Sequence, residues 1–270
     1  MKKRWLIPMA VTGVAVAGLP RKFDITHYEI HSDKVVTPVR AVMLADLHND
    51  SYGPKMKKLV QAVRNQKPDL ILMPGDMCDI DHQEEHTLEF FREMSDIPMY
   101  YSTGNHEEFR NDLPILLNMI KKTGVNIPEH TGMVFQKGDT RLEILSLPCY
   151  KQEYYFKAPD ISAQFHTDGY RILLAHRPEW FNLYRDVKCD LITSGHAHGG
   201  QWRIPGTDQG VFAPEQGMFP KLTSGMHELG HNKMIINRGL VRFYHMAPRL
   251  YNNPEITVID FLPEEGRNIC

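Results

Sequence analysis

Ser194-Gly195-His196-Ala197-His198-Gly199-Gly200-Gln201 follows a short apolar run at 190–193 that we interpret as a buried strand. Four other polar clusters also follow such runs: Asp46-Leu47-His48, Gly75-Asp76-Met77-Cys78-Asp79, Gly104-Asn105-His106-Glu107 and Ala175-His176-Arg177. Carboxylate oxygens, amide oxygens and neutral imidazole nitrogens are ligands of hard and borderline divalent cations. The five clusters together therefore predict a two-metal site.

Strand and helix patterns alternate along the first half of the chain. Buried apolar runs predict strands, and apolar residues recurring every three or four positions predict helices. The strands are expected at 39–45, 69–73 and 97–102, and the helices at 54–66, 83–95 and from a cap at Asn111 or Asp112 to Gly124. Because open α/β sheets bind ligands at the carboxyl ends of their strands, the polar clusters are expected to converge.

The middle of the chain has a different pattern. Two short runs at 133–136 and 141–147 enclose Gly138-Asp139, which is typical of a β-hairpin and predicts a second, partly antiparallel sheet. Further strands are expected at 170–175, 190–193, 234–237 and 256–261, with a helix at 178–185.

Charge arithmetic indicates the kind of substrate. Two divalent cations about 3.5 to 4 Å apart need a bridging ligand, and Asp76 is the natural choice. If Asp46 and Asp76 are the only anionic ligands, the charges +4 and −2 leave +2, or +1 with a bridging hydroxide, so an anionic substrate is favoured. Such metals bring the pKa of bound water to about 7. Attack of metal-bound hydroxide on a phosphomonoester or phosphodiester is the reaction that fits best.

Four further residues are candidates for supporting roles. His106 follows Asn105 and is placed to protonate the leaving group. Asp79 either orients a ligand histidine or caps the following turn. Arg177 and Arg203 are the cations nearest the ligand motifs, and either is a candidate for holding a substrate phosphate.

The motifs DxH, GDxxD, GNHE, an isolated histidine after a strand, and GHxHGGQ resemble, in this order, the calcineurin-like metallophosphoesterase superfamily. The resemblance runs from about Asp24 to Phe261. The segments 194–201, 237–239, 248–249 and 253–255 resemble a bacterial branch whose members are often exported or membrane-associated. Where such members carry a twin-arginine signal, this chain has Lys2-Lys3-Arg4.

The resemblance implies a fold and a division of ligands. The implied fold is an α/β four-layer αββα sandwich of two mixed β-sheets flanked by helices, with a dinuclear metal site at loops after strand carboxyl ends. Asp76 bridges the ions and His106 is the catalytic histidine. One metal is held by Asp46, His48 and His198, and the other by Asn105, His176 and His196. Family members use Mn²⁺, Zn²⁺ or iron.

The amino-terminal segment differs from the rest. Lys2-Lys3-Arg4 precedes an uncharged, mostly apolar run at 5–19, and Pro20-Arg21-Lys22 follows. A membrane-spanning helix needs about 20 apolar residues, so this run favours a signal-like leader or a marginal anchor over 1–22, and a buried helix is the alternative. Residues 23–270 are expected to form one phosphoesterase domain, exported or membrane-associated in a bacterial envelope, with a cytoplasmic location as the alternative.

Composition limits the classes of partner. The net charge of −2 gives no broad positive field, so we expect no nucleic-acid-binding surface. The aromatic stretch at 154–157 is consistent with a substrate groove, a lipid contact or ordinary loop packing. With the apolar leader, it mildly favours an envelope lipid among phosphoester substrates; nucleotides remain the other class.

Two other functions are alternatives. His227-Glu228-Leu229-Gly230-His231 matches the HExxH signature of zinc proteases, but its flanks favour a loop near the mouth of the site over the required helix. The chain is alternatively a metal-binding module without turnover. Because no ligand or catalytic histidine of the motif set is missing, an enzyme is favoured.

Overall fold

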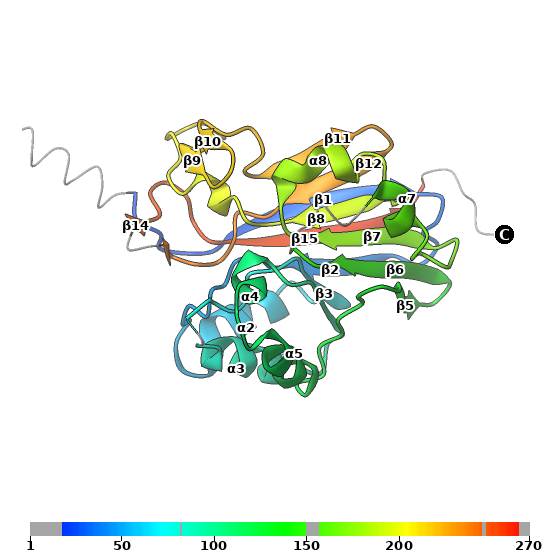
Figure 1. The fold of residues 1–270 in the computed structure, drawn as a ribbon, viewed down its shortest axis with the longest axis horizontal. Coiled ribbons are helices and arrows are strands. Elements are labelled where there is room, and N and C mark those ends of the chain that lie inside the picture. The colour runs from blue at the N-terminus through cyan, green and yellow to red at the C-terminus, as the bar shows by residue number, and fades with distance from the viewer. Residues whose placement is uncertain (1–17, 82, 150–156, 245–246, 265–270) are drawn as a thin grey trace, which may run out of the picture.

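The computed structural model describes residues 18–264 apart from 82, 150–156 and 245–246. Two mixed β-sheets pack face to face, and helices cover the outer face of each, so the molecule has four layers (Figure 1). The expected αββα sandwich is therefore confirmed. The described part begins at Gly18, so most of the leader predicted over 1–22 lies outside it, as does the aromatic stretch at 154–156. Within the described ranges, no helix is both long and apolar enough to cross a bilayer.

The first sheet has the strand order β1-β15-β2-β3-β4. Its strands are β1 (Asp24–Ser32), β15 (Glu255–Pro263), β2 (Val39–Met43), β3 (Leu70–Met73) and β4 (Met99–Tyr101). Only the β15–β2 pair is antiparallel among these strands. Strand β1 was not predicted from the sequence. It is an edge strand in which half-buried and exposed side chains alternate, so it lacks the continuous apolar run that marks the inner strands.

The second sheet has the order β11-β12-β8-β7-β6-β5. Its strands are β11 (Gly225–Leu229), β12 (Asn232–Ile236), β8 (Leu191–Ser194), β7 (Tyr170–Ala175), β6 (Thr140–Leu147) and β5 (Met133–Lys137). The inner pairs are parallel, and the pairs at both edges are antiparallel. The predicted hairpin at 133–147 is thus confirmed as β5 and β6.

Helices are present in all four segments where the sequence periodicity predicts them, and α7 (Ala158–Ser162) is an additional helix that was not predicted. The first sheet is covered by η2 (Pro54–Met56), α2 (Lys57–Arg64), α3 (Glu85–Glu93) and α5 (Leu113–Lys121), and the second by α7, η3 (Pro178–Trp180) and α8 (Phe181–Tyr184). The helix expected at 54–66 is divided, because Lys55 and Met56 have φ of 55° and 49°. Two short helices, α4 (Asn105–Glu108) and η4 (His198–Gly200), hold site residues. Two small hairpins complete the fold: β9 (Phe212–Ala213) with β10 (Gly217–Met218), and β13 (Phe243–Tyr244) with β14 (Ala247–Pro248).

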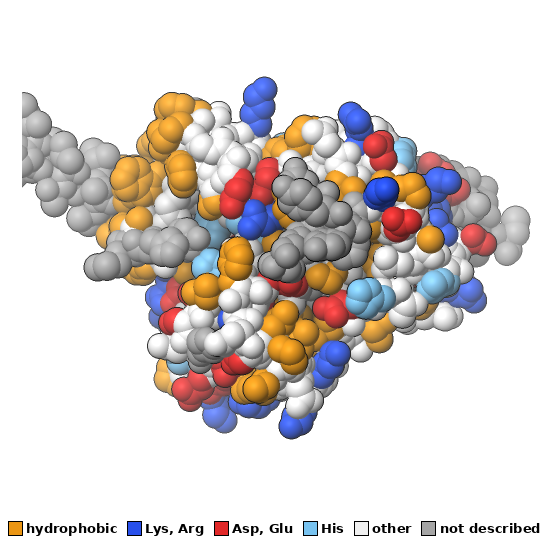
Figure 2. Space-filling view, in the orientation of Figure 1, with side chains coloured by type: hydrophobic (Ala, Val, Ile, Leu, Met, Phe, Trp, Pro, Cys, Tyr) orange, Lys and Arg blue, Asp and Glu red, His pale blue; other side chains and the backbone are white. Residues whose placement is uncertain are grey.

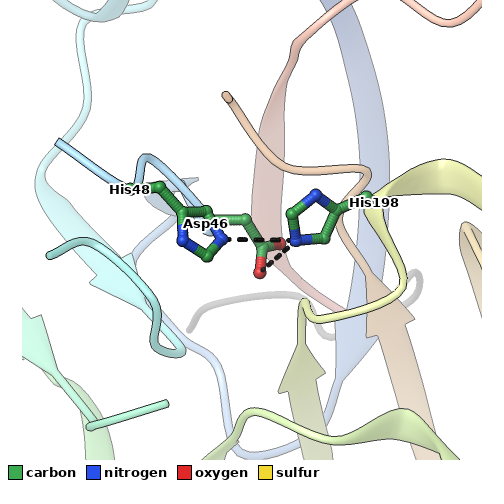
Figure 3. A group of neighbouring side chains, drawn as sticks. All are labelled: Asp46, His48 and His198. Carbon is green, nitrogen blue, oxygen red and sulfur yellow. Dashed lines mark hydrogen bonds and ion pairs between the residues drawn. The ribbon is translucent and has the colours of Figure 1, made fainter. Parts of the chain in front are cut away.

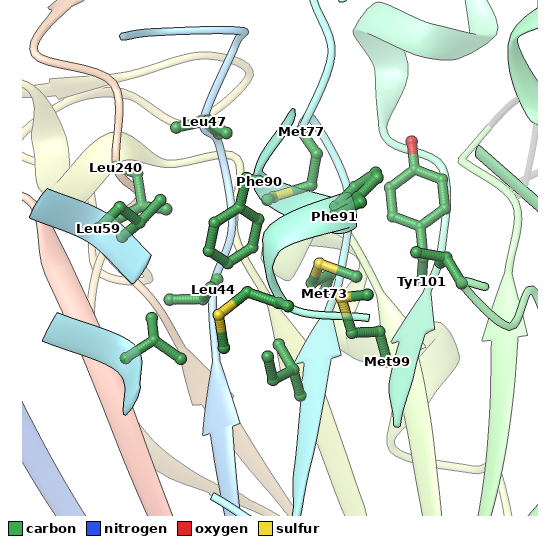
Figure 4. Packing of buried hydrophobic residues seen from close by; sticks show 14 of the residues in the cluster. Leu44, Leu47, Leu59, Met73, Met77, Phe90, Phe91, Met99, Tyr101 and Leu240 are labelled. Carbon is green, nitrogen blue, oxygen red and sulfur yellow. The ribbon is translucent and has the colours of Figure 1, made fainter. Parts of the chain in front are cut away.

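Buried side chains fix the strand ends that carry the site. Leu44 directly follows β2, Met73 is the last residue of β3, and Tyr101 is the last residue of β4. Phe90 and Phe91 of α3 pack over these three side chains (Figure 4). Alternate residues of the same strands point into a second core between the sheets. Because both faces are close-packed, the carboxyl ends of the strands have little freedom to move. The loops that follow them therefore start from fixed positions.

Candidate metal centre

The first group of predicted ligands consists of Asp46, His48 and His198, all buried. Asp46 and His48 follow β2, and His198 lies in η4 after β8. Figure 3 shows the Asp46 carboxylate and both imidazole rings pointing toward one another. The Nε2 atoms of His48 and His198 are 3.3 Å apart, and Asp46 Oδ1 lies 3.7 Å from His198 Nε2. The ligand atoms of the group all lie within 4.8 Å of one another, as binding to one cation requires.

The second group adjoins the first through Asp76. Asp76, His176 and His196 have ligand atoms within 4.8 Å of one another. Asp76 Oδ2 lies 3.1 Å from His176 Nε2 and 3.7 Å from His48 Nε2, so one carboxylate oxygen faces both groups. His176 Nε2 is also 3.9 Å from Asp46 Oδ1. The structure thus brings residues from four separate loops, those after β2, β3, β7 and β8, into one buried cluster.

Unusual backbone conformations aim these side chains. Asp46, His48, Asp76, His196 and His198 all have φ between 47° and 66°, in the left-handed region. Such residues each cost of order 1–3 kcal/mol and concentrate at functional sites. Mutual hydrogen bonds hold the loops in place: the Asp46 carboxylate accepts the backbone N–H of His196 at 2.9 Å, and the backbone N–H of His48 donates to the Asp76 carbonyl at 3.0 Å.

Two glycines permit the loops to approach so closely. A Cβ atom at Gly104 would collide with the carboxylate of Asp76, and one at Gly195 would lie 2.7 Å from both Ala45 Cβ and an Asp46 oxygen. Neither position has room for a larger residue, because a Cβ at Gly104 would also lie 2.6 Å from the Asp76 backbone nitrogen. These glycines of the GNHE and GHxH motifs are therefore required by packing against the predicted ligands.

Divalent cations fit this donor set. Asn105 Oδ1 is buried and makes no hydrogen bond to the described residues. A buried polar atom without a partner is rare and costly, and a cation would satisfy it. Burial and the nearby His48 and Arg249 charges also lower the pKa of His198 well below its usual value, which favours its neutral form. Neutral imidazole is the form that binds metal.

His106 and Asp79 form a hydrogen-bonded pair beside the cluster. His106 Nδ1 lies 2.7 Å from Asp79 Oδ1, while Asp79 Oδ2 lies 3.8 Å from His48 Nδ1. Asp79 also accepts the backbone N–H of Ile80 at 2.7 Å. Both roles considered for Asp79 are thus consistent with the geometry: its carboxylate orients histidines and also caps the turn. Burial lowers the pKa of His106, but Asp79 and Asp76 outweigh it, so the net shift is upward.

Glu107 has a structural role that the sequence analysis missed. Its carboxylate is fully buried and accepts backbone N–H groups of Asp76 at 3.1 Å, Cys78 at 2.8 Å and Gly104 at 2.8 Å. Burial and the Asp76 charge raise its pKa to about 7. Glu107 joins the loops after β3 and β4, and the signal for it was its place in the GNHE motif.

The two candidate arginines have different surroundings. Arg177 lies next to the cluster and pairs with Glu179 at 3.2 Å and with Glu215 at 3.1 Å. Arg203 is buried and pairs with Asp208 at 2.8 Å, and it donates to Ser224. Among the described residues, the contacts of Arg203 are away from the predicted ligands. Of these two arginines, only Arg177 pairs with a residue, Glu215, that also contacts a predicted ligand, and a substrate-binding role stays a prediction for both.

Side chains distant in the sequence also support the GHxH turn, and the sequence analysis gave them no role. Glu215 Oε2 lies 2.8 Å from His196 Nε2. Arg249 is fully buried, and it and Asn252 both donate to the His198 carbonyl, at 3.2 and 2.7 Å. In the sequence, Arg249 and Asn252 were indicated only by the resemblance of the segment around 248–255 to the bacterial branch of the superfamily.

The HExxH segment does not form a protease site. His227 and Glu228 lie in β11, and His231 lies in the turn before β12, so the motif is a β-hairpin; both the helix of a zinc protease and the loop we predicted are wrong. His227 Nε2 contacts the Ser224 carbonyl at 2.9 Å, and His231 Nε2 contacts the Val187 carbonyl at 3.1 Å. The pairing of β11 with β12 imposes the strand conformation.

Changing Glu228 to Gln is expected to leave hydrolysis unchanged. A zinc protease of the HExxH type would lose its general base, whereas Glu228 is an exposed side chain on the strand β11. Turnover of phosphoesters and of a casein substrate should be measured for both proteins. Proteolysis that the substitution abolishes would contradict this interpretation.

Metal binding is expected to release protons at neutral pH. Burial lowers the pKa of His176, but the neighbouring Asp76 and Asp46 outweigh it and raise the pKa to about 9 in the absence of metal. A metal must displace that proton, so affinity should fall as the pH decreases below about 9. Calorimetric titration of the protein with Zn²⁺ in buffers of different ionisation enthalpy measures the number released. A buffer-independent binding enthalpy at pH 7 would contradict the expectation.

The fold and the cluster define a class of protein: a metal-dependent hydrolase of phosphoric esters. Residues 39–200, more than half of the chain, match the calcineurin-like phosphoesterase family (Metallophos). The chain belongs to this family, which uses divalent metal ions. The resemblance seen in the five motifs is thereby confirmed for the family.

Relatives with known sequences include bacterial and animal proteins. The chain is 26% identical to Phosphodiesterase YaeI of Escherichia coli over 83% of each chain, and 24% identical to the uncharacterized metallophosphoesterase YkuE of Bacillus subtilis over 88% of this chain and 85% of that one. It is 26% identical to a zebrafish transmembrane protein with metallophosphoesterase domain, over 93% of this chain and 60% of that one. Among solved structures, the Thermus thermophilus sulfate thiohydrolase SoxB shares the fold, with a TM-score of 0.50 and 9% identity over 90% of this chain and 57% of that one.

Proposed function

We propose that the chain is a dinuclear phosphoesterase whose bridging ligand is Asp76. One cation would be held by Asp46, His48 and His198, and the other by Asn105, His176 and His196. The observation that carries the proposal is the position of Asp76 Oδ2, which faces His176 Nε2 at 3.1 Å and His48 Nε2 at 3.7 Å. Residues 23–270 would form one catalytic domain.

The residues of the site favour an anionic substrate. When bound, two divalent cations supply a water of lowered pKa and positive charge for the phosphoryl group. The proposed ligands contribute only the two carboxylates of Asp46 and Asp76, so the centre keeps net positive charge. Arg177 lies beside the centre, although Glu179 and Glu215 already pair with it. A phosphomonoester or phosphodiester supplies the negative charge that such a centre favours. Mn²⁺, Zn²⁺ and iron all suit the mixed oxygen and nitrogen donors.

His106 is the group proposed to act on the leaving group. Its hydrogen bond to Asp79 favours the protonated imidazole, and its backbone N–H donates to Asp76 Oδ1 at 2.9 Å, which fixes the ring next to the proposed ligands. A protonated imidazole in this position donates its proton to the departing alkoxide. Asp79 is the positioning residue for His106.

Substrate class and location are proposed from weaker observations. The name of the Escherichia coli relative, Phosphodiesterase YaeI, favours a phosphodiester such as an envelope phospholipid, and a nucleotide is the other proposed substrate class. The apolar run at 5–19 and the zebrafish transmembrane relative support a membrane-associated or exported protein. A metal-binding module without turnover is the competing function.

The test is a substrate screen with protein of measured metal content. Protein reconstituted separately with Mn²⁺, Zn²⁺ and Fe²⁺ is assayed on matched aryl phosphomonoesters and phosphodiesters, nucleotides and phospholipids. We expect turnover of a phosphoester at two metals per chain, and loss of activity on chelation. Two bound metals with no turnover of any of these substrates would favour the non-catalytic module.

A further inference from the structure

Exposed apolar side chains gather at the end of the molecule where the described chain begins. Phe212 and Met218 of β9 and β10, Phe219, and Phe243 of β13 are each at least half exposed, and Trp202 is 44% exposed. We call these five residues the apolar rim. Figure 2 shows hydrophobic side chains gathered over β9 and β10. Contiguous exposed apolar surface is uncommon in soluble proteins and marks sites of interaction.

Hydrogen bonds link the segments that carry the apolar rim. Phe212 lies opposite Met218 in the β9–β10 hairpin, and the residue before β9 donates its N–H to the Trp202 carbonyl at 2.8 Å. The Trp202 indole N–H donates to the carbonyl of Pro248 at 2.9 Å, and Pro248 pairs with Phe243. The segments that carry these residues are therefore joined to one another, and Phe219 directly follows Met218.

The apolar leader of the sequence joins the fold beside this rim. Residues 5–19 are uncharged and mostly apolar. Gly18, at the end of that run, accepts the backbone N–H of Tyr251 at 2.7 Å and packs against the Tyr251 ring. The preceding residue, Leu250, bridges to Trp202 of the rim. The leader is therefore attached to the described fold, at Gly18, at the end of the molecule that carries the rim.

Positive charge lies next to the rim. A cavity of about 300 Å³ is lined by Arg21, Lys22, Lys58 and Arg242, the last of which directly precedes Phe243. Asp50 pairs with Arg242 at 2.6 Å, and the described residues that line the cavity include no acidic one. Apolar side chains flanked by cations are the combination that binds anionic bilayers: the apolar groups enter the interface and the cations stay at the level of the headgroup phosphates.

We propose that the apolar rim docks the protein on the surface of an anionic lipid bilayer, with the cations of the cavity facing lipid phosphates. The bilayer is favoured over a protein partner because the apolar leader and the flanking Arg21 and Lys22 meet the rim at the same end of the molecule. The same hairpin carries Glu215, which reaches His196 at 2.8 Å, so the docked face adjoins the metal centre. This binding is independent of the proposed phosphoesterase activity.

The experiment measures sedimentation of the full-length, metal-free protein with vesicles in chelator. The vesicles are either phosphatidylcholine alone or phosphatidylcholine with phosphatidylglycerol. The test variant is F212S/M218S/F219S, and the matched control is I115S/V134S, which removes exposed apolar side chains from α5 and β5. A third variant, R21S/K22S, tests the charge. Circular dichroism confirms that each variant is folded.

We expect the wild-type chain and the I115S/V134S control to bind anionic vesicles equally, and the triple variant to bind at least tenfold more weakly. R21S/K22S should lose the preference for anionic over neutral vesicles, and added salt should weaken wild-type binding. Triple-variant binding at wild-type strength would overturn the proposal, because the leader alone would then suffice. The wild-type chain could instead form a dimer that does not bind vesicles, while the triple variant is a monomer. That result would also overturn the proposal, because the rim would then bind a second copy of the chain. Because no metal is present, neither outcome bears on the phosphoesterase activity.

Discussion

Changing Asp76 to Asn is expected to remove metal loading and turnover together. Asp76 Oδ1 accepts the backbone N–H of His106 at 2.9 Å, while Oδ2 faces the imidazoles of His176 and His48. The amide keeps the shape and the first hydrogen bond but loses the negative charge shared by both proposed cation positions. Removing that charge should lower kcat/KM by about a thousandfold or more, because a metal pair supplies several kcal/mol of charge stabilisation.

Metal content is the readout that separates this role from a structural one. The variant should contain fewer than two metals per chain by elemental analysis, with an unchanged circular dichroism spectrum. Asp208→Asn is the matched control, because the Asp208 carboxylate is fully exposed. A D76N protein that keeps two metals and wild-type activity would show that another group bridges.

The inner strands were predictable because both of their faces are buried. In β2 and β3, alternate residues enter the helix-covered core and the core between the sheets, so the sequence shows continuous apolar runs. The polar residue that ends such a run is then placed at the sheet edge. This is why the sequence predicted the positions of Asp46, Asp76 and His176 after the strand ends. Strand β1 has one partner and an alternating pattern, and its position depends on pairing with β15, which lies over two hundred residues away.

Residues that contact the cluster from long loops were not predictable in the same way. Glu215 reaches His196 from the β9–β10 hairpin, and nothing in the residues around it indicates that the hairpin folds back. Arg203 shows the converse: it is five residues from His198 but its partners are Asp208 and Ser224. Gln201, with φ of 56°, lies in the turn between His198 and Arg203. Proximity in sequence therefore did not distinguish the two arginines: Arg177 contacts Glu215, which reaches His196, whereas Arg203 pairs with Asp208.

Changing His106 to Ala is expected to keep both metals and to remove most of the activity on poorly activated esters. His106 belongs to neither group of proposed ligands around Asp76, and its Nδ1 is bonded to Asp79 at 2.7 Å. Loss of general acid catalysis typically costs about 10²- to 10⁴-fold in kcat. An ester whose leaving group departs without a proton, such as p-nitrophenolate, should be affected much less. His27→Ala, on the exposed face of β1, is the matched control.

The Asp79→Asn variant tests the same role through pH dependence. Asp79 opposes the effect of burial and raises the pKa of His106, so the protonated acid persists to higher pH in the wild-type protein. Without that carboxylate the pKa falls, and the alkaline limb of the kcat profile should move to lower pH while metal content stays at two per chain. A merely structural role for Asp79 would lower kcat at every pH equally. Full activity of His106→Ala on an alkyl phosphoester would instead show that the proton comes from another group, and Asp79 would then have no acid to position.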